Sequence, residues 1–64
     1  MCQISVVHQQ QEKEELIAEN VSQLEVESNG VRISTLFEEP KLIDGAVISR
    51  IDFLAGKVIL TNKL

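Results

Sequence analysis

The sequence predicts an all-β domain, and three observations carry this prediction. Apolar and polar residues alternate over several short segments, as they do in strands that bury one face. Residue pairs that favour tight turns, such as Asn29-Gly30 and Ala55-Gly56, separate these segments. Nowhere do apolar residues recur at spacings of three and four over the length of a helix. We therefore expect short strands joined by tight turns.

Two strands are expected in the first third of the chain. Residues 2–8 alternate with period two and are rich in β-branched side chains. The polar residues 9–13 contain no apolar anchor and are predicted to form an exposed hairpin loop. Residues 14–18 fit a helical turn or a short strand. We favour the strand, because Leu16 and Ile17 are adjacent and no apolar residue precedes them at helical spacing.

The middle of the chain carries the strongest local signal, a β-hairpin. Residues 23–28 and 31–37 both alternate, and Asn29-Gly30 stands between them. This pair tolerates positive φ at both central positions, which predicts a type I′ turn.

The last third is expected to hold two further strands. Pro40 lacks an amide hydrogen and is expected to end pairing near residues 38–41. The remaining elements are, in order, a turn or bulge at Asp44-Gly45, a strand-rich run over residues 46–54, a turn at Ala55-Gly56 and a strand over residues 57–61.

About five short strands in a single domain over residues 1–64 predict a small, partly open antiparallel barrel of SH3-like type. A chain of 64 residues buries only about 60% of its unfolded surface, so a lone monomer is marginally stable. The first strand has apolar residues on both faces and is a candidate sheet edge that a second copy covers. We therefore expect a homodimer.

The composition excludes several classes of protein. Hydrophobic residues make up 44% and charged residues 25% of the chain, as in a globular domain. The net charge of −4 and only two aromatic residues argue against nucleic-acid binding. No apolar run reaches the length of a membrane span, and the start lacks the pattern of a signal peptide. With a single cysteine, this predicts a cytoplasmic protein without membrane contact.

Cys2, the only thiol, is the candidate metal ligand. If Met1 is retained, its amine, the Cys2 amide nitrogen and the Cys2 sulfur form two fused five-membered chelate rings. If Met1 is removed, the Cys2 amine and sulfur form one such ring. These donors suit Ni(II), copper or zinc, and a symmetric dimer that joins two such termini completes the coordination of one metal ion. The equally weighted alternative is that Cys2 is a small apolar residue at the end of a strand.

The other candidate ligands are weaker. His8 lies about 20 Å along an extended strand from Cys2, so the two residues of one chain cannot share an ion. We expect His8 to be a partly exposed residue at a strand end. The acidic residues Glu12, Glu14, Glu15 and Glu19 lack the spacing of a calcium loop and are expected to be solvated. Without a nucleophile–base pair or a phosphate loop, the chain is not expected to be an enzyme.

Three segments in this order are similar to those of a known family. They are Met1-Cys2, the run Val31-Arg32-Ile33-Ser34-Thr35-Leu36-Phe37 followed by acidic residues, and the stretch Ile48–Leu60 with Ile51-Asp52 and Val58-Ile59-Leu60. Together with the chain length, they resemble the CooT family of small nickel-binding proteins. The resemblance implies a homodimeric metallochaperone with a small β-barrel fold that binds Ni(II) through Cys2 of each chain. It also implies nickel supply to carbon monoxide dehydrogenase or a broader role in nickel handling.

The chain departs from this family at two places, and two other functions remain open. Glu38-Glu39-Pro40 follows Phe37 where many relatives have Gly, and Leu54-Ala55-Gly56 stands where many have His. The first alternative is an SH3-like protein-interaction module in which Cys2 is incidental. The second, a small RNA-binding barrel, is disfavoured because the six basic residues are dispersed.

Overall fold

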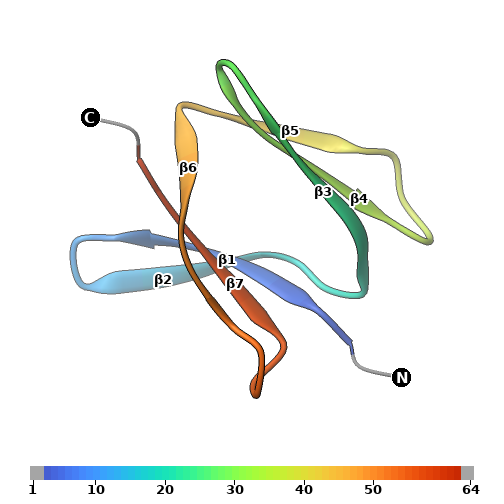
Figure 1. Ribbon diagram of the computed structural model, residues 1–64, viewed down its shortest axis with the longest axis horizontal. Coiled ribbons are helices and arrows are strands. Elements are labelled where there is room, and N and C mark those ends of the chain that lie inside the picture. The colour runs from blue at the N-terminus through green and yellow to red at the C-terminus, as the bar shows by residue number, and fades with distance from the viewer. Residues whose placement is uncertain (1–2, 63–64) are drawn as a thin grey trace.

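The computed structural model describes residues 3–62, which form seven strands in two sheets (Figure 1). The strands are β1 (Ser5–Gln10), β2 (Lys13–Ala18), β3 (Val21–Glu27), β4 (Gly30–Thr35), β5 (Lys41–Asp44), β6 (Ala46–Asp52) and β7 (Lys57–Asn62). One sheet has the order β2-β1-β7-β6 and the other the order β3-β4-β5. The all-β prediction is confirmed. Within residues 3–62 the sheets do not close into a barrel.

The structure has seven strands where about five were expected. It extends the first hairpin and adds one strand, β5. The polar loop expected over residues 9–13 shrinks to Gln11 and Glu12, with Gln11 at a φ of 55°. Strand β5 was not predicted, since only four residues follow Pro40 before the next turn. This strand forms because it pairs with β4. Ile43 of β5 lies opposite Val31 of β4.

The β3–β4 hairpin is confirmed, but its turn differs from the predicted type. Glu27 pairs with Gly30, so Ser28 and Asn29 form the turn and Gly30 begins β4. Neither Asn29 nor Gly30 has a positive φ, which excludes the type I′ geometry. Glycine is required at position 30 for another reason: a Cβ there would collide with the carbonyl oxygen of Ile43 on β5.

The first strand lies inside a sheet and not at its edge. Strand β1 pairs antiparallel with β2 on one side and parallel with β7 on the other, and Ser5 lies opposite Lys57 (Figure 1). This parallel pair corrects the prediction of a purely antiparallel sheet. It also rules out the expectation that a second copy covers the edge of this strand, because both edges of β1 are already paired.

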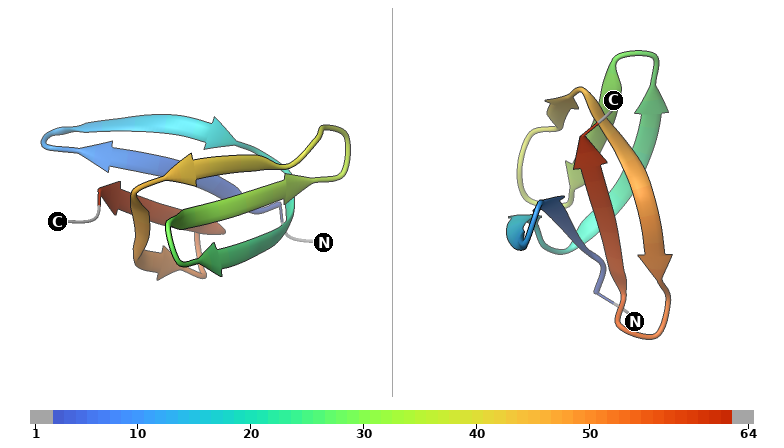
Figure 2. Two further views of the ribbon diagram at one scale, coloured as in Figure 1. Left: turned by 90° about the horizontal axis from the view of Figure 1, so that it is seen from above. Right: turned by 90° about the vertical axis from the view of Figure 1, so that its left-hand side faces the viewer.

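The core lies between the two sheets. Val6, Val58 and Leu60 of the four-stranded sheet cluster with Val31 and Ile33 of the three-stranded sheet, and all five are buried. The β1–β2 hairpin extends beyond the three-stranded sheet, on the side where the C-terminal end lies (Figure 2, left). The tip of this hairpin, residues 9–13, consists of polar side chains, so this end of the molecule is largely polar.

Candidate functional site

The first described residues are held by two backbone hydrogen bonds and pass close to Gly56. The amide of Ser5 donates to the carbonyl of Gly56 at 2.8 Å, and the carbonyl of Ile4 accepts from the amide of Val21 at 3.0 Å. At Gly56, which has a φ of +66°, a Cβ would lie 2.7 Å from the carbonyl oxygen of Gln3. The segment is thus fixed between the β6–β7 turn and the start of β3. The predicted ligand Cys2 precedes this clamp but lies outside the described residues.

An apolar groove borders the same segment. Its volume is about 480 Å³, and it is lined by Gln3, Ile4, Asn20, Val21, Ser22, Leu36 and Phe37. Residues 3 and 4 form one part of the lining, and the residues at the end of β4 form another. The residue that follows Cys2 in sequence therefore lies on an apolar concave surface.

Four large apolar side chains are strongly exposed at two turns. Leu36 and Phe37 follow β4 and are 70% and 82% exposed, while Phe53 and Leu54 between β6 and β7 are 84% and 102% exposed. Asp52 shapes the second turn, because its Oδ1 accepts from the amides of Leu54 at 3.1 Å and Ala55 at 3.0 Å. Sequence reasoning missed both exposed pairs. Their signal is two adjacent apolar residues directly before a turn, which cannot both face one core.

His8 is buried, contrary to the expectation of a partly exposed residue. Its side chain shares a face of β1 with Val6 and is only 6% exposed. Its Nε2 lies 3.0 Å from Oδ1 of Asn62 on β7. Because β1 is paired on both sides, it cannot pair about Ser5 with β1 of another copy, the arrangement that would bring His8 to the partner's N-terminus. His8 is therefore a structural residue at the margin of the core.

The acidic residues Glu12, Glu14, Glu15 and Glu19 are exposed, as predicted. The carboxylate of Glu14 lies 3.3 Å from Nζ of Lys57. Within residues 3–62, no group of three or more His, Cys, Asp and Glu side chains is arranged to hold a metal ion. The described part of the chain also has no helix of the length and apolar character needed to cross a membrane.

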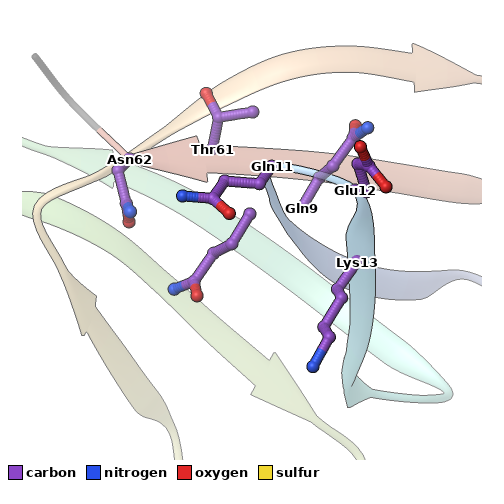
Figure 3. A pocket seen from close by; sticks show the side chains of 7 residues that line it. Gln9, Gln11, Glu12, Lys13, Thr61 and Asn62 are labelled. Carbon is purple, nitrogen blue, oxygen red and sulfur yellow. The ribbon is translucent and has the colours of Figure 1, made fainter.

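A second, polar hollow lies at the opposite end of the molecule. Its volume is about 980 Å³, and its lining is Gln9, Gln10, Gln11, Glu12, Lys13, Thr61 and Asn62 (Figure 3). The side chains come from the β1–β2 hairpin and the end of β7, and most of them are exposed. Flexible amides around an open hollow provide neither a nucleophile nor a metal-ligand cluster. The N-terminal end is therefore the better candidate for the functional site.

These features define a small all-β protein whose N-terminal segment is clamped at an apolar end of the fold. The family model for CooT, described as the CO dehydrogenase accessory protein CooT, matches residues 1–61. The chain belongs to the CooT family.

A solved structure supports the same assignment. The crystal structure of a protein assigned to CooT from Carboxydothermus hydrogenoformans is 27% identical in sequence and superposes with a TM-score of 0.85. The match covers 98% of this chain and 100% of that chain. No curated protein matches this chain.

Proposed function

We propose that the chain is a Ni(II)-binding, non-enzymatic accessory protein that supplies nickel for the maturation of carbon monoxide dehydrogenase. The observation that carries the proposal is the family match over residues 1–61, a span that includes Cys2, the only thiol of the chain. Membership of a family of carbon monoxide dehydrogenase accessory proteins supports the role in maturation. Nickel as the metal, Cys2 as its ligand and the dimer are parts of this proposal.

Cys2 is the proposed metal ligand, together with the terminal amine or a neighbouring amide nitrogen. A thiolate and a nitrogen from one chain form a five-membered chelate ring, and such donors suit square-planar Ni(II). Cys2 directly precedes Gln3, whose carbonyl oxygen lies close to Gly56, and Ile4 and Ser5 are hydrogen-bonded to the fold, which supports a site at this end of the molecule. Nickel is the cargo of the protein in this proposal, which requires a site that releases as well as binds it.

One chain supplies too few donors for four-coordinate nickel. We propose that two chains join at their N-terminal ends, so that each metal ion receives Cys2 from both copies. The β1 edge is not available for this contact, so the dimer forms through side chains or turns.

A titration of Ni(II) into the purified protein tests the proposal. We expect thiolate-to-nickel absorption that saturates at one nickel per two chains, with the same ratio in native mass spectra. Cys2→Ser should abolish the absorption and leave the circular dichroism spectrum unchanged. Absence of binding at micromolar nickel, or full binding by Cys2→Ser, contradicts the proposal. The second result, with a partner protein still bound, would favour an interaction module in which Cys2 is incidental.

A further inference from the structure

Phe37 stands between two grooves at the N-terminal end of the molecule. The first is the 480 Å³ groove that includes Gln3 and Ile4. The second, of about 310 Å³, is lined by Leu16, Ile17, Ala18, Glu19, Asn20, Thr35, Phe37, Glu38 and Lys41. Phe37 and Asn20 belong to both linings. We call Leu36, Phe37 and these two grooves the Phe37 surface.

The rim of the Phe37 surface is acidic. Glu19 and Glu38 line the second groove. Lys41 is the only basic residue in either lining. Its Nζ lies 4.0 Å from the carboxylate of Glu38 and donates to the carbonyl of Ile17 at 3.4 Å. The rim therefore keeps a negative excess around an apolar centre.

We propose that the Phe37 surface docks the nickel-free form of carbon monoxide dehydrogenase, through a segment that combines an apolar side chain with basic ones. An exposed aromatic side chain flanked by grooves is the usual form of an interface anchor. The acidic rim selects a basic segment and steers it to the surface. Because Gln3 lines the first groove and follows Cys2, docking here brings the recipient to the proposed nickel ligand. This inference rests on the proposed function.

A second copy of this chain fits the Phe37 surface less well. A two-fold interface joins the same patch of both copies. Such contact would gather Glu19 and Glu38 of both chains around one apolar centre, and each chain already carries a net charge of −4. Like charges brought together at an interface oppose association. The recipient is therefore the occupant that this charge distribution favours.

Phe37→Ser and Phe53→Ser form a matched pair for the test, because both replace an aromatic ring that is more than four-fifths exposed. Only Phe37 lines the grooves. Purified nickel-free carbon monoxide dehydrogenase is immobilised, and the affinity of the nickel-loaded protein for it is measured at several salt concentrations. We expect Phe37→Ser to weaken binding by about tenfold or more, as for an interface anchor. Phe53→Ser should stay within about twofold of the unaltered protein.

The charges of the rim give a second readout. Binding of the unaltered protein should weaken as salt is added, and Glu19→Gln combined with Glu38→Gln should flatten this dependence. The proposal is overturned if the unaltered protein does not bind the enzyme or if the two Phe variants bind equally. It is also overturned if light scattering shows that Phe37→Ser turns a dimer into a monomer, since a second copy then occupies the surface. A separate nickel titration of each protein distinguishes the two proposals. If the unaltered protein does not bind nickel, the proposed function is refuted. If it binds nickel normally but does not dock on the enzyme, only this inference is refuted.

Discussion

The ammonium of Lys57 on β7 lies 3.3 Å from the carboxylate of Glu14 on β2, and β1 runs between these two strands. Lys57 is opposite Ser5 and Glu14 is opposite Gln9, so the ion pair passes over the face of β1 that carries Val7. Val7 is buried, although it does not belong to the core cluster between the sheets. The ion pair therefore crosses the outer face of the four-stranded sheet, where we expect the methylene chain of Lys57 to cover Val7.

We expect the methylene chain of Lys57 to matter more than its charge. Lys57→Ala removes cover from Val7 and should lower the free energy of unfolding by about 1 kcal/mol. Lys57→Met keeps most of the cover and should cost less than about 0.5 kcal/mol, as should Glu14→Gln, because exposed ion pairs contribute little. Urea unfolding followed by circular dichroism measures all three. Equal losses for Lys57→Ala and Lys57→Met would show that the charge dominates.

The reason for glycine at position 30 can be tested against position 45. Gly30→Ala places a methyl group against the backbone of Ile43 and should destabilise the fold by about 2 kcal/mol or more, because β5 must move. Gly45 has a φ of +72° with open space around it, so Gly45→Ala should cost only about 1 kcal/mol of backbone strain. The midpoints of urea unfolding compare the two variants. A larger loss for Gly45→Ala would contradict this explanation.

Gly56 should couple the fold to nickel binding. Gly56→Ala adds the strain of a positive φ and also pushes against the carbonyl oxygen of Gln3, which precedes the clamp at Ser5. We expect it to weaken Ni(II) binding several-fold, measured by competition with a chelator. Gly45→Ala is the control, because it carries similar strain far from residue 3 in sequence and should leave the affinity unchanged. If both variants bind nickel normally, the clamp does not position the ligand.

The contact of His8 with Asn62 should stabilise the fold without affecting nickel. Asn62→Ala removes the partner of a buried ring nitrogen and should lower the free energy of unfolding by about 1 kcal/mol. A double-mutant cycle with His8→Ala isolates the interaction between the two side chains. Nickel stoichiometry should stay the same in Asn62→Ala. A change in stoichiometry would mean that His8 takes part in metal binding.

Nickel affinity should increase with pH. The reference pKa values are about 8 for a terminal amine and about 8.5 for a thiol, so protons compete with the metal at neutral pH. Each ligand that must lose a proton makes the apparent affinity about tenfold weaker for each unit of pH below its pKa. Titrations between pH 6 and pH 9 should show this rise, with protons released on binding. An affinity that does not depend on pH would argue against thiolate and amine ligands.

Strand positions could be predicted where local signals suffice. The alternation around Leu24 and Ile33 identified the β3–β4 hairpin, because side chains of a strand alternate between its faces whatever the strand pairs with. Strand β5 could not be predicted in this way, since its four residues are held by pairing with β4. Gly30 was assigned to the wrong geometry for the same reason: the contact that requires it comes from β5.

By itself, the sequence determined the all-β class, the hairpin, the solvated acidic residues and the family, as well as Cys2 as the candidate ligand next to the amino terminus. These properties depend on local patterns and covalent neighbours. Only the tertiary structure placed β1 beside β7, buried His8 against Asn62 and bonded Ser5 to Gly56 and Ile4 to the start of β3. These contacts join residues up to 54 positions apart. Pairing at that distance depends on how all seven strands pack, which no local pattern encodes.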